Sequence, residues 1–92
     1  MRYFLISTSL FVLFGNNAVL AQKSLFRKAD HEYNRMRYST AIQYYESGLA
    51  SDSLDIVAVE RLALSYKNIR DYKNAEKWFA RAIYLSPENV RF

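Results

Sequence analysis

The sequence predicts an all-α protein made of two copies of a helix-turn-helix unit. Apolar residues form 51% of its 92 residues, while only two glycines and one proline interrupt them. This composition disfavours disorder and turn-rich β folds. The chain also matches itself when 22–55 is aligned with 56–89, and within each copy apolar side chains recur at helical spacing. Composition, repeat and periodicity therefore agree on four helices.

The N-terminal segment, 1–21, has the organisation of a secretory signal peptide. Met1 and Arg2 give a positive start, and an apolar run over 3–14 follows before Gly15-Asn16-Asn17. Ala21, with Val19 two positions earlier, suits signal peptidase, so we expect cleavage before Gln22. The alternative is an uncleaved membrane anchor, but a spanning helix needs roughly 20 apolar residues and the asparagines interrupt this run earlier.

Residues 22–55 and 56–89 form the two predicted copies, and residues 90–92 look like the start of a third. Small residues match small ones across the copies, aromatic match aromatic, and aliphatic match aliphatic. The matching pairs are Ala29 with Ala63, Tyr38 with Tyr72, Ala41 with Ala75, Tyr45 with Phe79, Gly48 with Ala82, and Leu49 with Ile83.

We expect helices near residues 23–36, 39–50, 54–69 and 72–85, with short loops that make neighbouring helices antiparallel. One apolar stripe supports the second helix and another the fourth. Asp71 is a suitable N-cap for the fourth helix, and Pro87 stops it because proline has no amide hydrogen to donate. The stripes are Tyr38, Ala41, Ile42, Tyr45 and Leu49, and Tyr72, Ala75, Phe79, Ala82 and Ile83.

The second copy resembles the tetratricopeptide repeat, a helix-turn-helix unit of about 34 residues. Its signature positions hold Leu62, Ala63, Tyr66, Tyr72, Ala75, Phe79, Ala82 and Pro87, with Val59 in place of the first signature aromatic. The first copy keeps Ala29, Tyr38, Ala41, Tyr45 and Gly48, but has Glu32 at the usual tyrosine and Ser53 at the usual proline. The resemblance implies a short right-handed α-solenoid that binds a protein or peptide.

The same resemblance implies a binding groove lined by the first helix of each pair. By matching position, its residues are Lys23, Phe26, Asp30, Tyr33 and Asn34 in the first copy, and Val57, Glu60, Leu64, Lys67 and Asn68 in the second. The alternative is that these are ordinary solvated positions. Phe26 and Asp30 stand where the subtype that grips chaperone C-termini needs lysine and asparagine, so we do not expect that subtype.

Catalytic and metal chemistry find no support in the sequence. Cysteine is absent and His31 is the only histidine, which leaves no thiol, histidine pair or triad. There is no glycine-rich phosphate loop, and Asp52 and Asp55 are interpreted as helix-start residues. The net charge of +4 is spread along the helices rather than gathered in a block. We expect no enzyme activity, cofactor, metal, nucleic acid or small-molecule substrate.

A weaker resemblance is to the N-terminal repeats of outer-membrane-protein-A-family envelope proteins, and rests on the signal peptide and the Tyr-x-x-Ala-Ile-x-Tyr-Tyr pattern beginning at Tyr38. It implies a periplasmic or outer-membrane-associated scaffold that binds an envelope or secretion component. Two alternatives remain: a structural spacer in a peptidoglycan-associated protein, and an RNA-binding helical repeat.

The predicted second copy has no repeat or polar capping helix after it. About three repeats are usually needed to bury enough apolar surface. The end face near Trp78 and Ile83 should then be partly bare, which predicts self-association, a covering partner or a chain that continues beyond Phe92.

Overall fold

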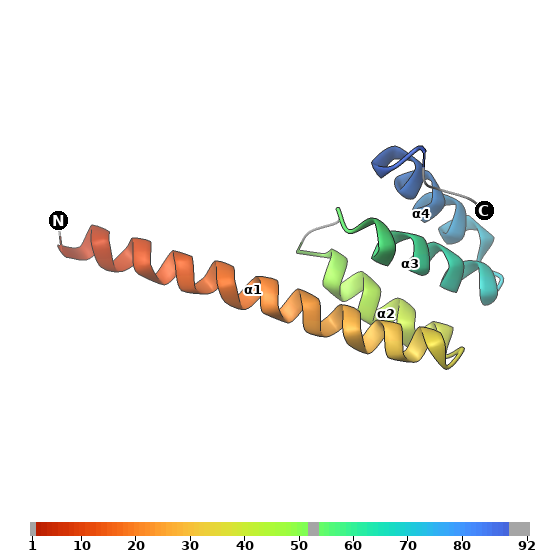
Figure 1. Cartoon of the computed structure of the whole chain (residues 1–92), viewed down its shortest axis with the longest axis horizontal. Coiled ribbons are helices and arrows are strands. Elements are labelled where there is room, and N and C mark those ends of the chain that lie inside the picture. Colours follow the sequence, from red (N-terminus) through yellow and green to blue (C-terminus); the bar gives the residue numbers. More distant parts are fainter. Residues whose placement is uncertain (1, 52–53, 89–92) are drawn as a thin grey trace.

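The computed structural model describes the backbone of residues 2–51 and 54–88, and the side chains of 18–51 and 54–88. Within these ranges the protein is all helical, as the sequence predicts. The helices are α1 (Arg2–Asn34), α2 (Tyr38–Leu49), α3 (Ile56–Asn68) and α4 (Tyr72–Leu85). Each packs against the next along the chain, so that α2 lies between α1 and α3 (Figure 1).

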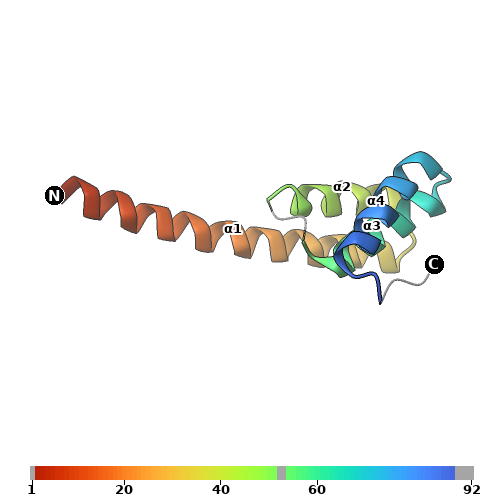
Figure 2. The ribbon, with the colours of Figure 1, turned by 90° about the horizontal axis from the view of Figure 1, so that it is seen from above.

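The first helix begins far earlier than expected, at Arg2 rather than near residue 23, and its N-terminal half extends away from the other helices (Figures 1 and 2). The helix continues through Gly15-Asn16-Asn17, where the apolar run ends, because glycine and asparagine lower helix propensity by about 1 kcal/mol or less each, whereas proline would break the helix. None of the helices, over the residues described, is both long and apolar enough to span a membrane.

The repeat is visible in the backbone at the two turns that follow α1 and α3. Met36 and Arg70 both adopt positive φ, at 62° and 65°. The next amide donates to a carbonyl five positions back in both turns, Arg37 N to Glu32 O and Asp71 N to Tyr66 O, each at 2.9 Å. This hydrogen bond and the positive φ define a Schellman helix end, and it recurs at matching positions.

Helix starts differ between the copies. Asp71 caps α4 as predicted, accepting a hydrogen bond from Asn74 N at 3.3 Å, and Asp55 caps α3 by accepting from Ala58 N at 3.1 Å. Arg37 occupies the matching position before α2 and makes no side-chain cap. Asp52 lies outside the described residues.

The core is continuous through all four helices and is built on small residues that let the helices approach. Gly48 shows this most clearly, because the ring of Phe26 from α1 occupies the space where a Cβ would stand. The predicted signature residues take three environments. Ala29, Ala41, Tyr45, Gly48, Ala63, Ala75 and Ala82 are buried, Tyr38, Tyr66 and Phe79 are half-buried, and Tyr72 and Pro87 are exposed.

Tyr72 departs from its repeat partner for a local reason. Tyr38, its counterpart, packs edge-on against Tyr33 with ring centres 5.7 Å apart. The residue matching Tyr33 in the second copy is Lys67, which offers no ring. Tyr72 is consequently 63% exposed.

Candidate functional site

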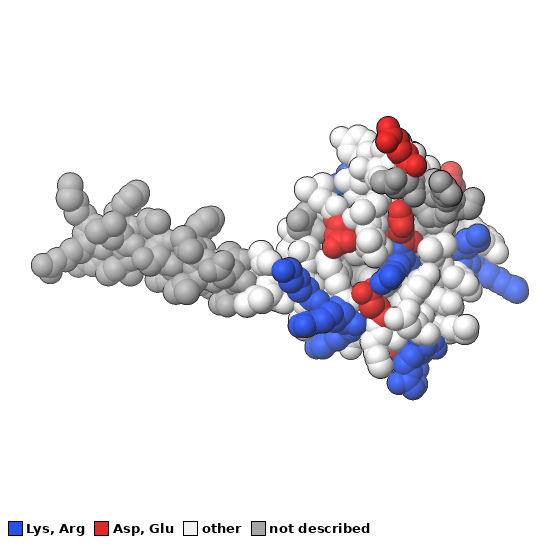
Figure 3. All heavy atoms as spheres, viewed as in Figure 1, with Lys and Arg blue, Asp and Glu red and all other residues white. Residues whose placement is uncertain are grey.

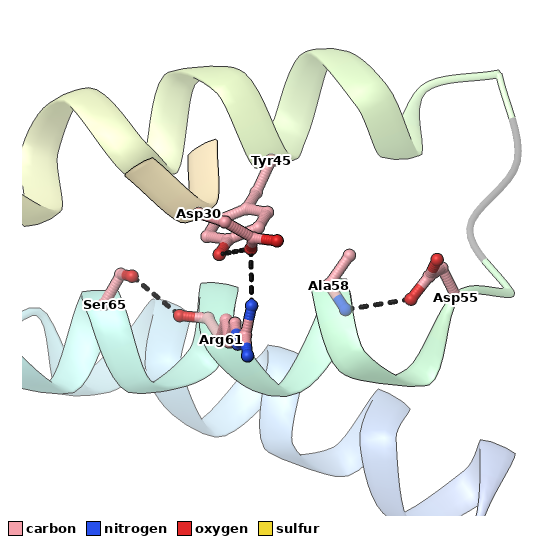
Figure 4. A network of polar contacts seen from close by, with 6 residues as sticks. All are labelled: Asp30, Tyr45, Asp55, Ala58, Arg61 and Ser65. Atoms are coloured by element: carbon pink, nitrogen blue, oxygen red, sulfur yellow. Dashed lines mark hydrogen bonds and ion pairs between the residues drawn. The ribbon is translucent and has the colours of Figure 1, made fainter. Parts of the chain in front are cut away.

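Three polar residues join the two copies beside the predicted groove. Asp30 of α1 accepts a hydrogen bond from the Tyr45 hydroxyl of α2 at 2.5 Å, and forms an ion pair with Arg61 of α3 at 2.7 Å (Figure 4). The Arg61 guanidinium also lies 5.7 Å from the centre of the Tyr33 ring. Asp30 thus fixes the position of α3 relative to both helices of the first copy.

The environment of this network changes its proton affinities. The hydrogen bond from Arg61 to Asp30 raises the pKa of the Arg61 guanidinium. Burial, followed by the hydrogen bond to Asp30, raises the pKa of the Tyr45 hydroxyl well above its ordinary value. Both groups therefore keep their protons at neutral pH, so the network carries one ion pair and one neutral hydroxyl.

A second polar contact joins the copies near the C-terminal end of α3. The Tyr66 hydroxyl donates a hydrogen bond to the carboxylate of Glu46 in α2. Burial, and then this contact, raise the pKa of the Tyr66 hydroxyl. Together with the Asp30 network, this contact fixes the orientation of α3 against the first copy.

A hollow of about 160 Å³ lies next to the Asp30 network. Its walls are the Phe26 and Tyr45 rings and the side chains of Val57 and Ala58, and its polar groups are the carboxylates of Asp30 and Asp55. Small-molecule sites usually enclose roughly 300–1,000 Å³, so this hollow suits one side chain better than a cofactor. Asp30 is neutralised by Arg61, whereas Asp55 has no ion pair among the described residues. The hollow therefore carries a net negative charge.

The structure brings only some predicted groove residues together. Phe26, Asp30 and Val57 line the hollow. Tyr33 instead packs against Tyr38 and Tyr45. Lys23, Asn34, Lys67 and Asn68 are exposed, and Glu60 and Leu64 are half-buried, all outside the lining of the hollow.

Sequence reasoning missed three residues of this region as site residues. Tyr45 was predicted only as core, Asp55 only as a helix start, and Arg61 was not singled out. A signal for the network does exist in the differences between the copies: Asp30 matches Leu64, and Glu46 matches Ala80. Both acidic residues that bridge the copies are replaced by apolar ones in the second copy.

A wider open groove of about 440 Å³ runs along α4. Trp78, Ala80 and Tyr84 form its apolar surface, with Lys77 and Arg81 beside them. Each cation lies over a neighbouring ring, Lys77 at 5.5 Å from Trp78 and Arg81 at 5.6 Å from Tyr84. On the face shown in Figure 3, Lys and Arg side chains form separate groups over the middle of α1 and at the lower and right edges, and Asp and Glu side chains lie between and above them.

Residues 58–89 match the family model of the tetratricopeptide repeat. The match falls on α3 and α4, which form the second copy, and is consistent with the all-helical structure. A repeat of this kind suggests a module for protein-protein interaction. No curated protein matches the chain significantly.

Proposed function

We propose that the protein is a non-catalytic scaffold that binds an extended segment of a partner protein, and that the hollow between the copies receives a basic side chain of that segment. The observation that carries the proposal is that Phe26 and Val57, from different copies, line one hollow with the carboxylate of Asp55. Apolar walls suit the methylene stem of lysine or arginine, and the carboxylate suits its charged end.

Asp55 permits a test that leaves the fold intact. Asparagine caps helices about as well as aspartate, so Asp55→Asn removes the charge while keeping the hydrogen bond to Ala58 N. Asp71→Asn is the matched control, since Asp71 caps α4 through the same contact with Asn74 N but does not line the hollow.

Affinities are measured by fluorescence anisotropy with full-length chain and a set of extended peptides that differ only in one central residue, Lys, Arg, norleucine or Glu. We expect the Lys and Arg peptides to bind best, and Asp55→Asn to weaken them by roughly tenfold, the effect of losing one charge-assisted contact. Asp71→Asn should bind like the wild type. Equal affinity for all four peptides would refute the proposal and favour a spacer role.

Phe26 is unsuitable as a probe of binding despite its place in the predicted groove. Its ring fills the space over Gly48, so truncation would disturb the packing of α1 on α2. Lys67, a predicted groove residue outside the hollow, is exposed. Its substitution should therefore disturb the packing less than truncation of Phe26. Charge reversal at Lys67 should weaken binding if the bound segment continues along α3 beyond the hollow.

We further propose that the chain is exported, that residues 1–21 are removed, and that the mature repeats form a right-handed solenoid in the periplasm or at the outer membrane. Exposure along α1 supports the cleavage point: the side chains from Ala18 to Ala21 are exposed, and Gln22 is half-buried and donates to Gly48 O at 3.1 Å. Mass spectrometry of the exported protein tests this, with Gln22 expected as the first residue and retained Met1 as the contrary result.

A further inference from the structure

A separate hollow of about 330 Å³ lies between α1 and α2. Its lining, which contains no residue of α3 or α4, consists of Arg27, Lys28, His31, Glu32 and Tyr44, and we call it the basic hollow. The hollow beside Asp30 holds about 160 Å³, whereas small-molecule sites usually enclose roughly 300–1,000 Å³. The basic hollow therefore has room for a whole small molecule.

Two positive charges of the basic hollow have no neutralising partner among the described residues. Arg27 and Lys28 are exposed, and neither forms an ion pair with a described residue. The one acidic group in the lining, the Glu32 carboxylate, already pairs at 3.8 Å with Arg37, which lies outside the lining. The basic hollow consequently attracts an anion.

The second copy shows what an arginine does at this place in the repeat. Arg27 matches Arg61, which forms an ion pair with Asp30 of the first copy at 2.7 Å. No described residue supplies Arg27 with such a carboxylate. Lys28 beside it is exposed, whereas its counterpart Leu62 is fully buried, so a second cation stands here in place of an apolar contact. An oxyanion from outside the chain can therefore take the place beside Arg27 that Asp30 takes beside Arg61.

His31 and Tyr44 add neutral hydrogen-bond donors to the two cations. Arg35 Nη1 lies 3.5 Å from His31 Nε2, and arginine can only donate, so the proton of the neutral ring is on Nδ1. Tyr44 is half-buried and carries a hydroxyl that can donate. Its ring and the methylene stems of Arg27 and Lys28 supply apolar surface. The lining thus combines charged donors, neutral donors and apolar walls.

We propose that the basic hollow binds a small soluble phosphate monoester, with Arg27 and Lys28 on the phosphate and the Tyr44 ring against the rest of the molecule. A phosphate monoester carries a charge of about −1.5 to −2 at pH 7 and three strong acceptor oxygens. These match the two unpaired cations and the two neutral donors. A carboxylate has one charge and two oxygens, and would leave one cation uncompensated. The site binds its ligand, and no reaction is implied.

A membrane that carries phosphate headgroups fits the same lining less well. A plane of anionic headgroups would meet the Glu32 carboxylate as well as the two cations, and like charges repel. A small molecule can turn its uncharged part towards Glu32, whose oxygens then accept hydrogen bonds from its hydroxyl groups. We therefore expect a ligand that carries hydroxyl groups beside the phosphate.

The test is nuclear magnetic resonance titration of the labelled full chain at about 0.15 M salt, where exposed charges more than about 8 Å apart are largely screened. The probes are glucose 6-phosphate, glucose 6-sulfate, which has a single negative charge, and glucose. We expect glucose 6-phosphate to bind with a Kd of about 0.1–1 mM and to shift the amides of Arg27, Lys28 and His31. The sulfate should bind at least about threefold more weakly, and glucose should not bind.

Three substitutions that remove the same charge locate the binding. Arg27→Gln and Lys28→Gln should each weaken binding of glucose 6-phosphate at least about tenfold, the effect of losing one charge-assisted contact. Lys23→Gln is the matched control and should bind normally, since Lys23 is exposed on the same helix but does not line the basic hollow. All three positions are exposed, so the variants should keep the fold, which circular dichroism checks.

Three results would overturn the inference. One is that Lys23→Gln weakens binding as much as Lys28→Gln, because the attraction would then come from overall charge. Another is equal affinity for the phosphate and the sulfate. The third is no binding of glucose 6-phosphate, and binding to phosphatidylcholine vesicles that contain phosphatidic acid would then identify a membrane contact instead. Asp55→Asn should leave the binding of glucose 6-phosphate unchanged, so the outcome is separate from that for the hollow beside Asp30.

Discussion

A Cβ at position 48 would lie 2.5 Å from Cε1 of Phe26, so Gly48 and the Phe26 ring fit together only because glycine has no side chain. The matching pair in the second copy is Ala82 and Glu60. Ala82 is fully buried, and Glu60 has no ring to place where Phe26 stands over Gly48, so this contact requires glycine only in the first copy.

Gly48→Ala should destabilise the protein even though alanine favours helix. Overpacking a core typically costs about 1–3 kcal/mol, against a gain of roughly 0.5–1 kcal/mol in helix propensity. Urea denaturation measures the difference. In the Phe26→Leu background the same change should cost less, because the shorter side chain leaves room for the methyl group. If Gly48→Ala lowered the free energy of unfolding equally in both backgrounds, the contact between position 48 and the Phe26 ring would not be the cause of the destabilisation.

Met36→Gly and Arg70→Gly should each stabilise the protein. Both residues hold positive φ at a Schellman helix end, where side chains other than glycine are strained by about 1–2 kcal/mol. Glycine relieves that strain but loses more chain entropy on folding, so we expect a net gain of up to about 1 kcal/mol. Thermal denaturation checks this, with Ser39→Gly inside α2 as a control that should destabilise. A lower melting temperature for both variants would contradict the assigned turn geometry.

Arg37→Asn should supply the missing N-cap of α2. Asp55 and Asp71 cap α3 and α4 through their carboxylates, while Arg37 has only a 3.8 Å ion pair with Glu32 and is largely exposed. A surface pair of this kind contributes little, whereas a good cap contributes about 0.5–2 kcal/mol. Chemical denaturation should show higher stability, and Arg37→Ala, which cannot cap, should not reproduce it.

Stability should fall above about pH 10 because three tyrosine hydroxyls, those of Tyr33, Tyr45 and Tyr66, hold their protons more tightly in the folded chain. Burial and a carboxylate neighbour raise the pKa of Tyr45 and of Tyr66 above the ordinary value of 10.0. Above that pH the unfolded chain binds fewer protons than the folded one, so the free energy of unfolding decreases as pH rises. Below about pH 10 these hydroxyls are protonated in both the folded and the unfolded chain, so their contribution to the free energy of unfolding is fully present.

Denaturation at a series of pH values tests this dependence. Tyr45→Phe and Tyr66→Phe should each flatten the alkaline decline, since phenylalanine keeps the ring and does not titrate. Tyr84→Phe, at a residue that is 77% exposed, is the control and should leave the decline unchanged. An identical pH profile in all variants would contradict the roles given to Tyr45 and Tyr66.

Local patterns predicted much of the fold. The second, third and fourth helices begin and end close to their expected bounds, and Asp71 caps α4 as predicted, because apolar spacing and cap chemistry act over short stretches of chain. The start of α1 was not predicted, because a glycine and two asparagines weaken a helix without ending it.

The candidate site was less predictable, because it depends on contacts between the copies. The pairing of Asp30 with Arg61 joins residues of different copies and is not part of the repeat. The exposure of Tyr72 depends on Lys67 replacing an aromatic partner. Both features arise where the copies differ, so the period alone does not show them.

Nuclear magnetic resonance can show directly whether the hollow between the copies binds a basic side chain of a partner. The labelled full chain is titrated with the lysine-centred peptide, and the amide shifts are recorded for each residue. If the hollow binds this side chain, the largest amide shifts fall on Asp55, Val57 and Ala58, and the norleucine-centred peptide reduces them. Shifts absent from these residues, or equal for both peptides, would contradict the proposal.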